Sequence, residues 1–92
     1  MMNLTKEQKK ELIAQSHKLH PVVMIGSKGL TEAVNIEIER ALESHGLIKI
    51  KVAGTDREAR NDMFATICDT HHAELINSIG FIGTFYRPAN TH

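Results

Sequence analysis

The feature that most constrains the fold is a short apolar run that passes through a Gly-x-x-Gly turn into a helix. Residues 22–25 form the apolar run, residues 26–29 the turn, and Thr31 stands where a helix would begin. Glycine adopts positive φ without steric cost and leaves the backbone uncovered. The start of a helix adds unpaired N–H groups and a partial positive charge. The segment therefore predicts a strand, a tight turn with an exposed main chain, and a helix.

The same turn suits the binding of phosphate. Lys28 supplies a full positive charge at its centre, Ser27 supplies a hydroxyl group, and Gly26 and Gly29 leave room for a ligand. A Gly-x-x-Gly loop of this kind clamps the nucleotide backbone in KH modules. On the turn alone, an ordinary connection that needs glycine for its geometry explains the sequence equally well. Both interpretations therefore stay open at this point.

Length and composition indicate a small globular protein. A chain of 92 residues supports one hydrophobic core, so we expect a single domain over residues 1–92. No apolar run is long enough to span a membrane, and the polar amino terminus does not have the pattern of a secretory signal. The single cysteine, Cys68, excludes an internal disulfide and is expected to be a packed residue. We expect a monomer in the cytoplasm.

Charge is balanced overall but segregated along the chain. The 11 basic and 11 acidic side chains cancel. Residues 1–28 carry five lysines against two glutamates, whereas residues 29–48 carry four glutamates against one arginine. Residues 49–60 carry four basic side chains against two acidic ones, and residues 61–92 carry one arginine against three acids. This segregation predicts a surface with a basic and an acidic side.

Capping patterns and apolar spacing place the first half of the fold. Thr5 and Gln8 form a capping box that opens a helix running to about His17. The continuous apolar run 22–25 predicts a strand buried on both faces. Thr31 caps a second helix that ends at Gly46. We expect the glutamates of this helix to face solvent; they are Glu37, Glu39 and Glu43.

The second half adds a strand, a helix and a hairpin. Residues 47–52 alternate, with apolar side chains on one side and Lys49 and Lys51 on the other. Thr55 and Glu58 form a second capping box, which opens a helix. Its predicted inward residues are Ala59, Met63, Phe64 and Ile67. Two β-like runs around Gly80 predict a hairpin. The order αβαβαββ indicates an α/β fold in which helices pack on a four-stranded mixed sheet.

With these elements placed, the chain resembles the CRM domain in its single-domain bacterial form, the YhbY family. The matching segments are His-Pro-Val-Val at 20–23, Ile-Gly-Ser-Lys-Gly-Leu-Thr-Glu at 25–32, Glu-Ile-Glu at 37–39 with Ala-Leu-Glu at 41–43, Leu-Ile-Lys-Ile-Lys-Val at 47–52, and Tyr-Arg-Pro at 86–88. The resemblance implies a fold similar to the C-terminal domain of translation initiation factor 3. It also implies binding of RNA and association with precursors of the large ribosomal subunit.

Three positions depart from the family pattern. Gly46 stands where an acidic residue is frequent, and Gly83 stands where an aliphatic residue is common. Phe81 replaces the basic residue that usually opens the last strand. This replacement either narrows the RNA-binding surface or exchanges a phosphate contact for base stacking. An ordinary hairpin aromatic is the simpler interpretation.

The resemblance turns the glycine loop and the nearby basic residues into a predicted RNA-binding site. Its members are Gly26, Ser27, Lys28, Gly29, Lys49, Lys51, Lys18, His20 and Arg87. Lys49 and Lys51 share one strand face and predict a basic stripe beside the loop, while Arg57 and Arg60 are weaker candidates. The alternative is a protein-interaction module that docks on ribosomal proteins through its acidic second helix.

Other chemistries find little support in the sequence. His17 and His20, or Cys68 with His71 and His72, give only a superficial metal-type spacing, since structural zinc sites use two tight pairs. No motif joins a nucleophile to a base and an orienting acid, and no phosphate-binding P-loop is present. We therefore expect no enzyme activity, no metal, no cofactor and no small-molecule substrate.

Overall fold

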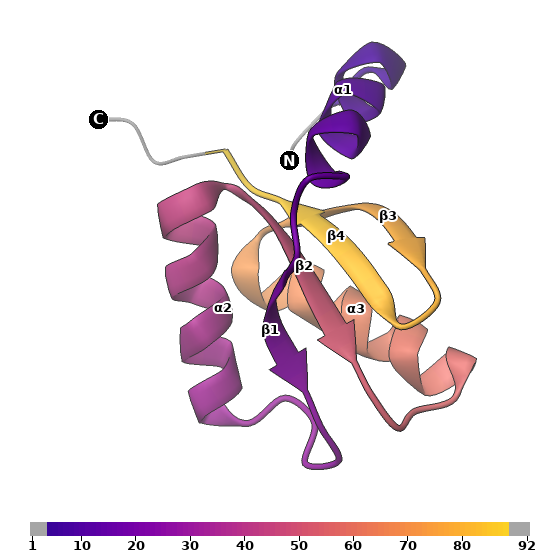
Figure 1. Cartoon of the computed structure of the whole chain (residues 1–92). Coiled ribbons are helices and arrows are strands. Elements are labelled where there is room, and N and C mark those ends of the chain that lie inside the picture. Colours follow the sequence, from indigo (N-terminus) through magenta and orange to yellow (C-terminus); the bar gives the residue numbers. More distant parts are fainter. Residues whose placement is uncertain (1–3, 89–92) are drawn as a thin grey trace.

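The computed structural model describes residues 4–88, and it contains three helices and four strands (Figure 1). In chain order the elements are α1 (Lys6–Ser16), β1 (Pro21–Ile25), α2 (Glu32–His45), β2 (Leu47–Val52), α3 (Arg57–His71), β3 (Glu74–Ile79) and β4 (Ile82–Tyr86). The predicted α/β class and the order αβαβαββ are confirmed.

The four strands form one mixed sheet in the order β1-β2-β4-β3. β1 is parallel to β2, while β4 is antiparallel to both β2 and β3. α2 and α3 cover one face of this sheet, and α1 lies apart from them near the end where β2 begins (Figure 1). Ser16 and His17, at the end of α1, line a pocket together with Lys49 and Thr84 of the opposite face. Ser16 and Thr84 are buried, so the end of α1 covers part of that face. We call this opposite face, which α2 and α3 leave uncovered, the open face.

The core lies between the sheet and the two helices α2 and α3. β2 contributes Ile48, Ile50 and Val52, each at most 1% exposed, so the predicted alternation of this strand is confirmed. The helices contribute buried side chains at helical spacing, which include Ile38, Leu42, Phe64 and Ile67. Burial of each such side chain stabilises the fold by about 1.5–3 kcal/mol relative to exposure. This core fixes β2 as the central support of the open face.

The predicted helix starts are confirmed for α1 and α2. Thr5 accepts a hydrogen bond from the Gln8 N–H at 3.1 Å while the Gln8 side chain accepts one from the Thr5 N–H, which is a complete capping box. Thr31 caps α2 by accepting from the Val34 N–H. Gly46 ends α2 with φ of 74°, a conformation that strongly favours glycine. Local side-chain chemistry therefore sets these boundaries.

The predicted start of α3 is wrong by one residue. Asp56, and not Thr55, is the N-cap, and its carboxylate accepts from the Ala59 N–H at 2.8 Å. A carboxylate at this place also interacts favourably with the helix dipole, which a hydroxyl group does not. Thr55 Oγ1 is buried and has no hydrogen-bond partner within the described residues. Ala59 is exposed, contrary to its predicted inward place, because it lies in the first turn of α3, ahead of the residues that reach the core.

The prediction that β1 is buried on both faces is also wrong. Val23 and Ile25 are buried, but Val22 is 52% exposed and Met24 is 63% exposed. β1 is the edge strand of the sheet, and α2 and α3 cover only one of its faces (Figure 1). Two large apolar side chains therefore stand on the open face, next to the basic stripe.

Candidate nucleic-acid interface

The Gly-x-x-Gly segment forms a tight turn between β1 and α2. The Gly29 N–H donates to the Gly26 carbonyl at 3.0 Å, and the Thr31 N–H donates to the Gly29 carbonyl at 3.0 Å. Gly29 has φ of 71°, which disfavours any other residue. At Gly26 no atom lies within 4 Å of the position that a Cβ would take. The turn is thus fixed by one glycine and left open to an approaching ligand by the other.

Lys28 is the main positive group on this turn. Ser27 and Lys28 occupy its two central positions, and both are exposed. The helix that follows carries Glu32 in its first turn, and this carboxylate offsets the partial positive charge of the helix start. Attraction of an anion at the turn therefore depends on the Lys28 ammonium more than on the helix dipole.

Two other connections meet this turn at the same end of the sheet. The Ala53 N–H donates to the Ile25 carbonyl at 2.9 Å, which places the connection after β2 beside the turn. The Val52 N–H donates to the Phe81 carbonyl at 2.8 Å, which adds the tip of the β3–β4 hairpin. Figure 1 shows the turn and these two connections at the lower end of the sheet. We call this the loop end.

A cation lies at the hairpin even though position 81 is not basic. The Arg60 guanidinium lies over the Phe81 ring, with its central carbon 5.0 Å from the ring centroid. This is the geometry of a cation–π contact, which at a partly exposed site contributes about 0.5–1 kcal/mol. Phe81 precedes β4 in the hairpin and is 49% exposed. Arg60, which the sequence offered only as a weaker candidate for the RNA-binding site, therefore brings a positive charge to the loop end.

The two lysines of β2 project onto the open face. Lys51 lies opposite Met24 on β1 and Ile82 on β4, and Lys49 lies opposite Thr84. Both lysines are half-buried. Within residues 4–88, the ion pairs are those of Glu39 with His71 and with Arg87, so neither lysine has a carboxylate partner there. The predicted basic stripe thus exists, and it begins at the loop end with Lys51.

The other predicted site residues lie elsewhere. Lys18 and His20 are exposed at the opposite end of β1, where they line a pocket. Arg87 follows β4, and its guanidinium makes two contacts with the Glu39 carboxylate, at 2.9 and 3.0 Å. The predicted site is therefore divided into the loop end with the lysine stripe, the start of β1, and Arg87.

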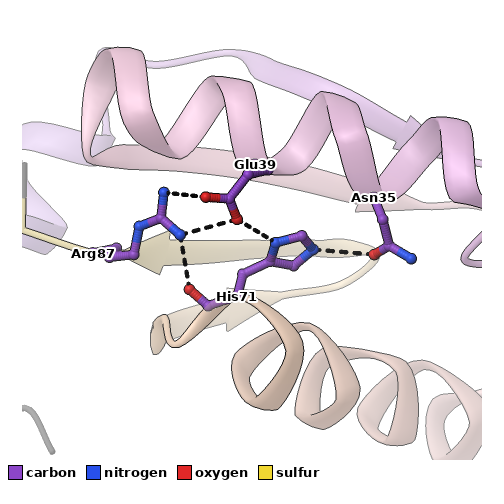
Figure 2. A network of polar contacts seen from close by, with 4 residues as sticks. All are labelled: Asn35, Glu39, His71 and Arg87. Carbon is purple, nitrogen blue, oxygen red and sulfur yellow. Dashed lines mark hydrogen bonds and ion pairs between the residues drawn. The ribbon is translucent and has the colours of Figure 1, made fainter. Parts of the chain in front are cut away.

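Arg87 belongs to a polar network between α2, α3 and the end of β4 (Figure 2). Its guanidinium also donates to the His71 carbonyl at 3.0 Å. The His71 ring, 4% exposed, hydrogen-bonds Glu39 at 2.9 Å and Asn35 at 3.0 Å. Glu39 thus points toward His71 and Arg87, although its side chain stays 42% exposed, and the expectation that it points away into solvent is wrong. Sequence reasoning missed His71 and Asn35, although the spacing of Asn35 and Glu39 places both on one side of α2.

This network makes the stability of the fold depend on pH. Hydrogen bonds from Arg87 and then from His71 lower the Glu39 pKa from 4.5 to about 2. A lowered folded-state pKa stabilises the fold fully above pH 4.5, and this contribution is lost as the pH falls from 4.5 through 2. Since the Glu39 side chain is 42% exposed, solvent screening limits the contribution to about 1 kcal/mol.

We expect Glu39→Gln to lower the free energy of unfolding by about 1 kcal/mol at pH 7. The difference from the wild type should shrink between pH 4.5 and pH 2, where the wild type also loses the charge. Urea unfolding at several pH values measures this difference. Glu37→Gln, an exposed neighbour on the same helix, is the matched control. A constant difference between the two variants over the whole pH range would contradict the assignment.

Three further findings concern Cys68, metal ions and membrane spans. Cys68 packs against the core as predicted, and burial raises the pKa of its thiol. Among the described residues, no three histidine, cysteine or acidic side chains are placed to hold a metal ion. Of the three helices in residues 4–88, none combines the length and the apolar character of a membrane span.

Comparison with known proteins identifies the family. The sequence pattern of the CRS1 / YhbY (CRM) domain matches residues 4–87. The chain belongs to this CRM-domain family. It is 46% identical over 89 residues to an "RNA-binding protein" of Haemophilus influenzae, with 97% of this chain and 90% of that protein covered. It is 42% identical over 86 residues to a "Probable RNA-binding protein" of Pseudomonas aeruginosa, with 94% and 83% covered.

A solved structure supports the same assignment. The solution structure of a hypothetical protein from Staphylococcus aureus superposes with a TM-score of 0.83 at 28% sequence identity. The match covers 97% of this CRM-domain chain and 93% of the other. The resemblance inferred from the separated sequence motifs is therefore confirmed in both family and fold.

Proposed function

We propose that this CRM-domain protein binds RNA and grips the phosphate backbone through the turn 26–29. The main support for the proposal is the exposed turn itself, in which Gly26 leaves the main chain open to a ligand. Lys28 stands at the centre of the turn and supplies most of the attraction for an anion, because Glu32 offsets the dipole of the following helix. The names of the relatives support RNA as the ligand and a binding protein rather than an enzyme. Lys51 and Lys49 extend the contact along the open face.

Salt dependence tests the electrostatic part of this proposal. If about four basic side chains neutralise phosphates of single-stranded RNA, log K falls with log salt with a slope of roughly −3. We expect the double variant Lys49→Ala and Lys51→Ala to reduce that slope by about 1.4. The matched control removes two exposed or half-exposed lysines of α1, Lys6 and Lys9, and should keep the wild-type slope. A flat response, or the full slope in the stripe variant, would take the stripe out of the interface.

We further propose that the bound RNA belongs to a precursor of the large ribosomal subunit. This proposal rests on the family resemblance. The alternative hypothesis is that the protein docks on basic ribosomal proteins through α2. The engagement of Glu39 in the polar network leaves Glu37 and Glu43 as the exposed acids in the middle and at the end of that helix, which weakens this alternative.

Co-sedimentation with purified precursor particles separates the two docking modes. RNA docking predicts that Lys28→Glu strongly weakens association and that nuclease treatment of the particles releases the protein. The paired variant Glu37→Lys and Glu43→Lys should associate like the wild type. Association that survives nuclease and Lys28→Glu but fails in the α2 variant would establish the protein-docking mode.

A further inference from the structure

A second candidate site lies at the start of β1, away from the loop end. A cavity of about 370 Å³ opens between the end of α1, the linker to β1 and the start of β2. Its floor is apolar and includes Leu19, Leu47 and Ile48. Leu47 and Ile48 are at most 9% exposed, so the floor belongs to the packed body of the protein. The cavity is large enough for a flat ring of the size of a nucleobase.

The rim of this cavity is polar and cationic. It consists of Gln15, Lys18, His20 and His45, all of which are exposed. The amide of Gln15 offers both donors and an acceptor, and Lys18 offers a charged donor. The two histidines supply aromatic faces of the kind on which unstacked RNA bases lie. None of the described residues that line the cavity is acidic.

We propose that this cavity takes up an unstacked base of the RNA strand whose backbone is held by the turn 26–29. The inference rests on the proposed function and names a second contact for the same ligand. β1 connects the two places, because it begins at the cavity and ends at the turn. Five residues of strand at about 3.3 Å each separate them by about 16 Å.

The surface between the two places is continuous and suits a nucleotide chain. Val22 lines the cavity, and Met24, the next residue on the same side of β1, is 63% exposed. Lys51 lies directly opposite Met24 on the neighbouring strand. The apolar side chains of Val22 and Met24 suit contact with bases, and the neighbouring Lys51 suits contact with the phosphates of the same strand. A docked protein side chain would fill the apolar floor, but it would leave the cationic rim and the continuity with the turn unused.

Oligonucleotide length and base removal test this inference. The reference experiment measures affinity for single-stranded RNA from about four nucleotides, the reach of a Gly-x-x-Gly loop, to about ten. We expect wild-type affinity to rise with length, and we expect removal of one base, at a single position of the long RNA, to weaken binding by about tenfold. The double variant Gln15→Ala and His20→Ala should bind the short RNA like the wild type. Its affinity should neither rise with RNA length nor fall when a base is removed.

Controls separate this inference from the proposed function. Asn61→Ala removes an exposed amide from α3 and should keep both the length dependence and the sensitivity to base removal. Lys28→Glu should weaken binding at every length. Since Gln15 and His20 are exposed, thermal melting should be unchanged in the cavity variant. The single variant His45→Ala provides a second test, because it should also weaken binding of the long RNA and spare the short one.

Four outcomes would overturn the assignment of the cavity. If the wild type binds RNA but tolerates base removal at every position, or if the cavity variants keep the length dependence, the cavity does not hold a base and the function of the turn stands. If the wild type binds neither short nor long RNA, both proposals fall. Loss of a bound ribosomal protein in the cavity variant, with RNA affinity unchanged, would assign the cavity to protein docking and contradict the inference.

Discussion

Lys28→Glu is expected to weaken binding of single-stranded RNA by about 30-fold at low salt. Two unit charges about 4 Å apart in water interact by about 1 kcal/mol, so reversing one of them changes the free energy of binding by about 2 kcal/mol. Lys28 is exposed and has no carboxylate partner within residues 4–88, so the fold should be unaffected. Fluorescence titration measures the affinity, and thermal melting measures the stability.

The matched control for this variant is Lys10→Glu. Lys10 is exposed on α1, at the other end of the sheet, and its reversal changes the net charge by the same amount (Figure 1). The control should lose little affinity, because interactions between distant exposed charges are screened at moderate ionic strength. Equal losses in the two variants would show that net charge, and not the turn, governs binding.

The largest expected effect on stability comes from Gly83→Ala. A Cβ at this position would lie 2.9 Å from a Phe85 ring carbon and 3.0 Å from two Phe64 ring carbons. The two rings form an edge-to-face pair with centroids 5.6 Å apart, and both are at most 1% exposed. Because neither ring can move without disturbing the core, we expect a loss of about 1–3 kcal/mol, or roughly 5–20 °C in melting temperature.

Two further variants test this packing explanation. Gly26→Ala introduces the same methyl group where nothing lies within 4 Å, and it should melt within a few degrees of the wild type. Phe64→Leu should partly rescue Gly83→Ala, since it frees the space that the added Cβ needs. The aromatic pair leaves no space for a side chain at position 83, which explains the glycine there. A wild-type melting temperature in Gly83→Ala would contradict the explanation.

Sequence reasoning succeeded at most places where local chemistry decides structure, with the exception of the start of α3, where Asp56 and not Thr55 is the cap. Thr5 and Thr31 cap helices through hydrogen bonds that span three residues, so they are visible in the sequence. The alternation of β2 and the stop at Gly46 are equally local. The turn 26–29 is exposed as predicted, and Gly29 has the positive φ that the sequence indicated, whereas Gly26 does not.

Sequence reasoning failed where segments that are distant in the sequence decide the placement of a side chain. A run of four apolar residues does not distinguish a strand covered on both faces from an edge strand covered on one, so the exposure of Val22 and Met24 was missed. Glu39 turns toward His71 and Arg87 because these two side chains, 32 and 48 residues further on, come to lie beside it. The placement of Arg60 over Phe81 likewise arises only when the hairpin meets α3.

Arg87 shows how the same limit affects site prediction. A basic residue in a family motif was assigned to RNA, yet its guanidinium already contacts Glu39 and the His71 carbonyl (Figure 2). Use of Arg87 by RNA would require loss of those contacts. We therefore centre the proposed interface on the turn and the lysine stripe, where the cations have no such partner within residues 4–88.

An NMR titration tests the central proposal most directly. Single-stranded RNA is added to isotope-labelled protein, and the backbone amide signals of every assigned residue are followed. Binding of RNA through the turn predicts that the largest shifts fall on Gly26, Ser27, Lys28 and Gly29, with smaller shifts at Lys51. Shifts confined to the exposed side of α2, around Glu37 and Glu43, with the turn unchanged at saturating RNA, would contradict it.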